Sequence, residues 1–389
     1  MKKSGGLFGF IMYLLICVVF SLTIYGCLIS FEVIEVPDKY NIVKIIDEKL
    51  NGTLENSENT TAVEKAYVTI KSAFKGNKND GDNTVPISTY ESENEHVLAP
   101  NADTEDYTYY SQLDNNAKII YSELEKNLDN MKSGTYNVDF GDTFDDLLHE
   151  ESGEQSLNNS FQLAINALNF DNPELFYIDI SKIYLLTKIT TKLWVTTYTV
   201  QIGSSQGQSY LSDSFANRDD VNLAITRIQN EKERMKYLAN GSTENKIRTI
   251  HDYLIDNLEY DATVSRDNIY NIYGALVNKK TVCEGYARSF KSMMDEIGVP
   301  CIIACGIGVN SAGQSENHAW NYVKLDGQWY AIDVTWDDPV IIGNGKLNNE
   351  LRYKYFLKGS NSFFDNHTED GQIVSNSNFR YPTLSMSDY

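Results

Sequence analysis

Residues 317–333, with the sequence NHAWNYVKLDGQWYAID, contain two strand-like runs on either side of Asp326 and Gly327. An Asp-Gly pair between two such runs is a strong short-range signal for a two-residue hairpin turn. We therefore expect an antiparallel hairpin made of residues 318–325 and 328–335.

The turn also sets the register of this hairpin. With Leu325 opposite Gln328, His318 lies one diagonal step from Asp333 on the same face of the sheet. Such a diagonal is about 7–8 Å between backbones, which an imidazole and a carboxylate can span with a hydrogen bond. His318 and Asp333 are thus predicted to touch, the competing interpretation being a polar pair on an exposed face. Aromatic bulk around them favours a partly dry pocket: Trp320, Tyr322 and Trp329.

A cysteine lies at the start of a predicted helix upstream of the hairpin. Thr281 and Glu284 have the spacing of a capping box, so the helix is expected to begin at Val282. Cys283 then lies in the first turn, where free amides and the helix dipole favour a thiolate, the form in which sulfur attacks. A buried cysteine that only fills space at a helix start would look the same. Position alone therefore leaves both interpretations open.

Composition limits the classes of partner. The chain has 389 residues and a formal net charge of -21, which repels phosphate backbones, so nucleic acid is not an expected partner. Cys301 and Cys305 fall in one predicted strand about 13 Å apart, so we expect no disulfide between them. A composition of 26 tyrosines and five cysteines suggests a secreted bacterial protein.

The N-terminal region is predicted to hold the chain at a membrane. The run Ser4–Phe31 carries no charge, and it exceeds the roughly 20 residues that span a bilayer. We expect a signal anchor and transmembrane helix over residues 1–31, with the rest of the chain outside the cell membrane. The alternative is a lipoprotein signal with lipidation at Cys27.

Residues 32–106 are expected to form a stalk and then an acidic disordered linker. Residues 77–106 contain eight Asp or Glu against one Lys, a composition that cannot bury itself. Residues 107–240 should then fold as a small α+β module. Its predicted helices lie near 117–131, 161–168 and 221–238, and its strands near 180–189 and 193–202. The segment Gly203–Gly207 has the form of a serine-hydrolase elbow, but no helix follows it, so we expect a loop.

Two further features are given structural interpretations. A helix is predicted to begin at Ser242 or Thr243, with His251 on its apolar side. We interpret His251 as a packed histidine, because no nucleophile lies near it in the sequence. Asp337 and Asp338 could bind a cation, but a turn before the following proline explains them better.

Three segments resemble the core of the transglutaminase-like superfamily in order, spacing and context. They are residues 282–287 (VCEGYA), 317–321 (NHAWN) and 329–337 (WYAIDVTWD). The likeness covers about residues 240–360, and the third segment is most similar to bacterial proteins and kyphoscoliosis-peptidase-like domains.

The resemblance implies a papain-like fold, in which a helix carrying the cysteine packs on an antiparallel sheet carrying the histidine and the aspartate. Carried over by position, it makes Cys283 the nucleophile, His318 the base and Asp333 the orienting acid. Some relatives use an aromatic side chain upstream of the cysteine to bind the oxyanion. Tyr260 is the candidate for that role here, together with the backbone amide of Cys283.

The predicted architecture is therefore α+β, with an N-terminal transmembrane helix, the module at 107–240 and a papain-like, transglutaminase-like catalytic domain at 241–389. The leading hypothesis is a membrane-anchored extracytoplasmic thiol enzyme that acts on peptide or protein amides, including those of the cell wall, through a cysteine thioester. Trp320 and Trp336 are candidates to line its substrate pocket, and no metal or cofactor is expected. Two alternatives stay open: a protein-crosslinking transglutaminase, and a cell-surface binding scaffold that keeps the fold without the chemistry.

Overall fold

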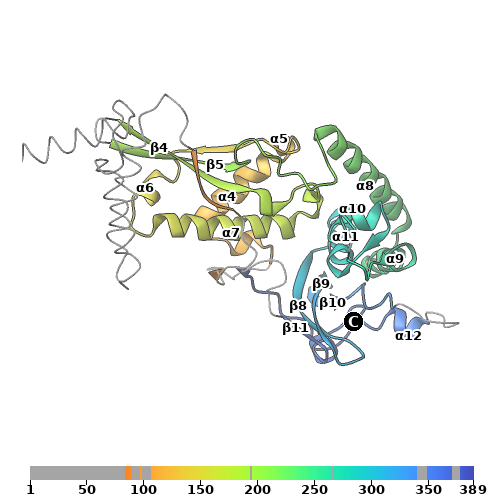
Figure 1. The fold of residues 1–389 in the computed structure, drawn as a ribbon. Helices are drawn as coiled ribbons and strands as arrows, with labels where there is room; N and C mark the ends of the chain where they lie inside the picture. The colour runs from red at the N-terminus through yellow and green to blue at the C-terminus, as the bar shows by residue number, and fades with distance from the viewer. Residues whose placement is uncertain are drawn as a thin grey trace, which may run out of the picture. The chain divides into compact units, whose positions relative to one another are not determined.

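A computed structural model describes residues 84–89, 97–98, 107–192, 195–264, 266–339, 348–369 and 377–389 (Figure 1). All of them belong to one compact unit, residues 84–389. The predicted anchor, the stalk and Cys27 lie outside the described residues. Within the described ranges, no helix combines the length and the apolar character needed to cross a membrane.

Helices and strands are mixed along the described chain. In chain order they are β1 (Thr84–Thr89), β2 (Val97–Leu98), α4 (Asn115–Lys126), α5 (Leu128–Met131), β3 (Val138–Gly141), α6 (Asp145–Leu148), α7 (Gly153–Asp171), β4 (Tyr184–Lys192), β5 (Val195–Gly203), α8 (Arg218–Leu238), α9 (Thr243–Asn257), β6 (Glu259–Tyr260), α10 (Ile272–Leu276), β7 (Lys280–Thr281), α11 (Cys283–Glu296), β8 (Cys301–Val309), β9 (Ser315–Leu325), β10 (Gln328–Ile332), α12 (Asn349–Arg352), α13 (Ser360–Phe363), β11 (His367–Glu369) and β12 (Ser377–Asn378).

The first sheet has the strand order β1-β4-β5-β3 and is antiparallel throughout. Figure 1 shows α4 and α7 running along this sheet. On α4 the buried positions Ala117, Ile120 and Leu124 recur every three or four residues, and they share one core with Val200 and Ile202 of β5. The predicted α+β character of this region is confirmed.

Strand β1 corrects part of the linker prediction. Residues 84–89 pair with β4 at the edge of the sheet, although we expected them within a disordered linker. The composition of residues 77–106, averaged over thirty positions, conceals this short β-prone stretch. Pro86, which has no N–H to donate, is tolerated because the strand is an edge strand with a shifted register beside it.

Other boundaries in this region differ from the prediction at their ends. Helix α7 begins at Gly153, eight residues earlier than expected. Its first turns are mostly polar, but Leu157 is buried and packs these turns against the core. Residues Ile180–Lys182 form a 3-10 turn before β4, capped by the side chain of Asp179. The segment Gly203–Gly207 leads into a loop, as predicted.

The second sheet has the order β10-β9-β8-β11 and is also antiparallel. The predicted hairpin register is confirmed, since Gln328 pairs with Leu325 and Ile332 with Asn321. Strand β10 ends at Ile332 instead of at residue 335, because a tight turn starts at Asp333, whose carbonyl accepts the Asp337 amide at 3.1 Å.

Helix α11 packs on β8 and β9 of this sheet. Its buried residues Tyr286, Phe290 and Met293 recur every three or four residues and so form one apolar face. Cys301 and Cys305 both lie in β8, and no disulfide joins them, in agreement with the prediction. The cysteine helix and the sheet of the resemblance are therefore present.

Polar contacts join α11 to the region before residue 240. The Arg288 guanidinium donates to the carbonyl oxygen of Asn169 in α7 at 2.7 Å. Ser292 of α11 and Lys232 of α8 both bind the carboxylate of Glu174, at 2.7 and 2.8 Å. These contacts hold α11, the helix that carries Cys283, on the face that points away from the sheet. The domain boundary at residue 240 stays a prediction.

Candidate active site

The start of α11 differs from the predicted capping box. Val282 is the N-cap and no side chain caps the helix. Thr281 lies in β7, where its hydroxyl donates to the carbonyl of Ile269 at 2.6 Å, and Glu284 pairs instead with Arg288 one turn later at 2.8 Å. Both side chains therefore bind partners outside the predicted capping box. Cys283 nonetheless occupies the first turn, partly exposed, as expected.

Gly285 explains why the motif needs a glycine after Cys283. A Cβ at this position would lie 1.7 Å from the Thr281 hydroxyl and 2.9 Å from the Ile269 carbonyl. Helix α11 therefore approaches β7 and the preceding loop closely enough that only glycine fits.

Changing Gly285 to Ala should lower the free energy of unfolding by about 1–3 kcal/mol, because the added methyl group must push α11 away from Thr281. Urea denaturation measures the loss, and the alkylation rate of Cys283 should fall with it. Ser289→Ala is the matched control on the same helix, since the buried Ser289 hydroxyl has no hydrogen-bond partner among the described residues and its removal should cost little. Equal stability of the two variants would contradict this account.

His318 on β9 binds Asp333 and lies near Cys283, the other two residues of the predicted triad. Its Nε2 lies 2.7 Å from the Asp333 Oδ2, so the predicted contact between them is present. The Cys283 thiol also lies within electrostatic range of the ring and contributes to the raised pKa of His318. Since Nε2 is bound to Asp333, Nδ1 is the nitrogen left for the sulfur.

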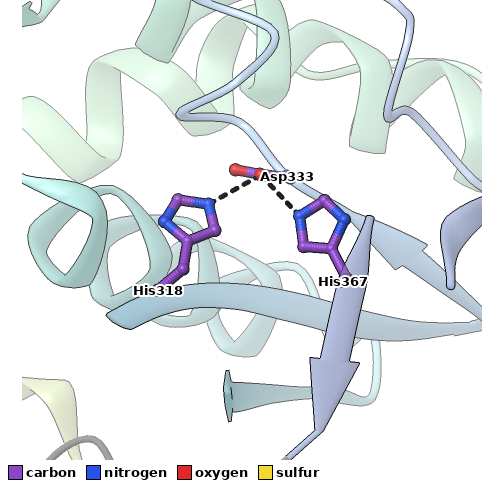
Figure 2. A group of neighbouring side chains, drawn as sticks. All are labelled: His318, Asp333 and His367. Carbon is purple, nitrogen blue, oxygen red and sulfur yellow. Dashed lines mark hydrogen bonds and ion pairs between the residues drawn. The ribbon is translucent and has the colours of Figure 1, made fainter. Parts of the chain in front are cut away.

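Asp333 is a fully buried carboxylate that accepts three hydrogen bonds. Besides His318, its oxygens accept the Nε2–H of His367 at 3.1 Å and the backbone amide of Trp336 at 3.1 Å. Figure 2 shows His318 and His367 reaching the carboxylate from opposite sides. His367 was missed in the sequence, because no local pattern places β11 beside β8.

The charges of the group support one another. Burial lowers the pKa of His318, but the charge and hydrogen bond of Asp333, with the contact of Cys283, outweigh it and raise this pKa to about 10. Burial raises the pKa of Asp333, yet the two histidines hold it well below its usual range. Burial and the charge on His318 lower the pKa of His367 against the pull of Asp333. At neutral pH the group is therefore a charged His318 on a charged Asp333, beside a neutral His367.

The two tryptophan candidates lie in different surroundings. Trp336 is partly exposed, and its ring stacks on that of His318, with centroids 4.7 Å apart and planes 23° apart. Trp320 is only 1% exposed and packs on Phe363 and His367 in the core. Trp320 therefore supports the site from behind, which corrects its prediction as a pocket residue; Trp336 stays a candidate.

Two side chains tie α11 to the elements that carry His318 and Asp333. Asn321 of β9 donates to the carbonyl of Ala287 in α11 at 3.0 Å. The hydroxyl of Tyr286 in α11 donates to Asp338, in the turn that follows Asp333, at 2.6 Å. These bonds fix Cys283 relative to its partners, and they account for the Asp338 carboxylate without a cation.

His251 also turns out to be bound across the fold. It is fully buried in α9, and its Nε2 lies 3.1 Å from Oδ2 of the equally buried Asp337. Its Nδ1 lies 3.0 Å from Asp252. Our interpretation of His251 as a packed histidine omitted this pair, which holds the far end of the turn that begins at Asp333.

Tyr260, the oxyanion candidate, lies in β6. It is half-buried, and burial followed by the nearby charge of Cys283 raises its pKa to about 12. Tyr260 is therefore close enough to Cys283 for electrostatic interaction, and its hydroxyl keeps its proton at neutral pH. Its role as a donor stays a prediction.

Among the described residues, one group of three possible metal-binding side chains lies close together. The ligand atoms of His318, Asp333 and His367 lie within 4.8 Å of one another. Ligands about 2.1 Å from a tetrahedral metal lie roughly 3.4 Å apart, whereas Asp333 lies 2.7 Å from His318. That distance is the length of a charged hydrogen bond, so we interpret the group as hydrogen-bonded side chains.

Comparison with known proteins agrees with the sequence motifs. Residues 232–334 match the model of the transglutaminase-like superfamily. The kyphoscoliosis peptidases of Homo sapiens and Mus musculus are 30% identical over 141 residues and 28% identical over 138 residues. Each match covers 33% of this chain and 21% of the relative, so the chain spans about a fifth of the length of these relatives.

A crystal structure of a TGase aligns over 50% of this chain and 56% of that chain, with 13% identity and a TM-score of 0.28. This likeness is too distant to add to the assignment, which rests on the family model and on the two peptidases. Residues 232–334 of the chain are therefore similar to the transglutaminase-like superfamily.

Proposed function

We propose that this chain is a thiol enzyme that acts on peptide or protein amides through a thioester on Cys283. The observation that supports it is the position of His318, which lies within electrostatic range of the thiol and is hydrogen-bonded to a buried carboxylate. A positively charged imidazolium beside a sulfur atom favours the thiolate, the form that attacks.

The chemistry follows from these three side chains. The Cys283 sulfur attacks the amide carbon and forms a C–S bond, while His318 gives its proton to the nitrogen as the C–N bond breaks. The amine leaves, and a thioester with a neutral His318 remains. His318 then takes a proton from water, whose oxygen attacks the thioester; the C–S bond breaks and the acid is released. Asp333 keeps the ring oriented and stabilises its charge, as the third residue does in analogous triads.

Groups around the sulfur support the remaining assignments. The Tyr260 hydroxyl and the Cys283 amide are the proposed donors to the oxyanion. Trp336, which is partly exposed over the His318 ring, is the proposed contact for the substrate.

We place this activity outside a cell membrane, on a bacterial chain held by the segment 1–31 or by a lipid on Cys27. The support is the uncharged N-terminal run in the sequence. Peptides of the cell envelope are the substrates within reach of such a site.

Alkylation tests the nucleophile directly. Iodoacetamide should modify Cys283 about 100-fold faster than Cys301 or Cys305, because those two are buried and Cys283 lies beside His318. Mass spectrometry of the peptides gives the three rates in one reaction. Similar rates at all three thiols would sink the assignment.

A panel of cell-wall peptides with a labelled amine separates the possible reactions. Wild type should release amine or acid, and Cys283→Ala should not. Incorporation of the label would instead favour a protein-crosslinking transglutaminase, in which the amine replaces water. Equal inactivity of both proteins would favour a binding scaffold.

A further inference from the structure

His367 has no part in the reaction described above, although it binds the same oxygen atom of Asp333 as the catalytic base His318. The Oδ2 of Asp333 lies 2.7 Å from Nε2 of His318 and 3.1 Å from Nε2 of His367. All three residues are at most 2% exposed, so the contacts lie in a dry part of the site. The two rings enter from different strands, β9 and β11, and point at the same carboxylate (Figure 2).

The ring of His367 is held firmly in this orientation. It stacks on Phe363, with centroids 4.0 Å apart and planes 14° apart, and it packs on Trp336 at 4.5 Å. Its Nδ1 faces the Asn366 side chain at 3.0 Å and the Phe363 carbonyl. Oxygen atoms thus lie at both ring nitrogens, which favours a protonated ring, while burial and the charge of His318 oppose it.

The proposed reaction makes Asp333 dependent on a second partner. His318 loses its proton to the leaving amine, so in the thioester state the buried carboxylate has no charged neighbour on that side. An ionised carboxylate left in a dry site without donors is strongly destabilised. The neutral His318 still donates its Nε2–H, and His367 and the Trp336 amide are the two other donors to the carboxylate.

We propose that His367 is a positioning residue that keeps Asp333 ionised and in place while His318 is neutral. This inference rests on the proposed function. In the resting state His318 carries the charge and His367 is a neutral donor. In the thioester state His367 becomes the stronger hydrogen-bond donor to Asp333. The carboxylate then attracts a proton on His318 less strongly, so the His318 ring stays neutral until it accepts the proton of the attacking water. The alternative is that His367 only fills space between Phe363 and Trp336.

Two variants distinguish these roles. His367→Phe keeps an aromatic ring between Phe363 and Trp336 but removes the donor, and His367→Gln keeps an N–H that can reach Asp333. Capping Cys283 with iodoacetamide gives an uncharged sulfur that stands for the thioester. The titration of His318 in the full chain is then followed by the ¹⁵N resonances of its ring.

We expect the capped His367→Phe protein to titrate His318 about one pH unit higher than the capped wild type, because Asp333 with one fewer donor binds the protonated ring more strongly. Capped His367→Gln should agree with the wild type. The other titratable groups that face His367 are Asp333 after β10 and Tyr355, whose hydroxyl binds Asn366; neither is changed. Equal midpoints in all three proteins would overturn the proposal.

Two controls keep the test decisive. If His367→Phe does not fold, the wild type suffices: capping removes the contribution of Cys283 to the raised pKa of His318, so the titration midpoint of His318 should fall while that of His367 rises, and two unchanged midpoints would overturn the inference. The same titrations in a Cys283→Ala background need no reactive thiol. Failure of the proposed function, seen as unselective alkylation, is thereby separate from failure of the role of His367.

Discussion

Changing Asp333 to Asn should lower the turnover of an activated acyl substrate by about 10³–10⁴-fold. The amide has nearly the shape of the carboxylate, so the fold should remain. It carries no charge, however, and its NH₂ group cannot accept a hydrogen bond, so His318 loses the partner that holds its tautomer.

The pH dependence of the same variant should change in a defined direction. In the wild type the pKa of His318 is raised to about 10, so activity that needs its proton persists through neutral pH and falls as the pH rises through about 10. Without the charge of Asp333, this alkaline limb should move toward the ordinary value of 6.5. The stability that the raised pKa contributes follows the same sign: it is fully present below pH 6.5 and is lost as the pH rises through about 10.

Asp326→Asn is the matched control. Asp326 lies in the turn of the same hairpin, with a positive φ that asparagine also adopts, and it touches neither His318 nor Cys283. Its turnover should stay within about twofold of wild type and its alkaline limb should not move. An Asp333→Asn enzyme within tenfold of wild type, with an unmoved limb, would show that Asp333 does not orient the base.

Changing Asp337 to Leu should lower the free energy of unfolding by about 3–5 kcal/mol. Both Asp337 and its partner His251 are fully buried, and the other Asp337 oxygen accepts the Tyr355 amide at 2.8 Å. The substitution therefore leaves two buried polar groups without their partner. Urea denaturation of the full chain measures the loss.

The pair can be separated from packing by a double-mutant cycle. His251→Leu with Asp337→Leu should cost less than the sum of the single changes, because no unpaired polar side chain of the pair remains. Asp365→Leu is the exposed control and should stay within about 0.5 kcal/mol of wild type. A cost below about 1 kcal/mol for Asp337→Leu would mean that the pair does not hold the turn.

Predictions from the sequence were correct where a few neighbouring residues set the geometry. The Asp326-Gly327 turn gave the register of the hairpin by counting, and the contact between His318 and Asp333 followed from it. The capping box at Thr281 failed because this hydroxyl binds Ile269, twelve residues away. A motif predicts contacts only when no distant group competes for the same atoms.

The sequence by itself therefore determined the hairpin, the helix that begins at Cys283 and the apolar faces that join them, because turn type and helical period are properties of neighbouring residues. Tertiary structure alone decided that His367 shares Asp333 with His318, and that His251 pairs with Asp337. These partners are separated by 34 and 86 residues. They meet because whole strands and helices pack side by side, and no local period records where a distant strand will lie.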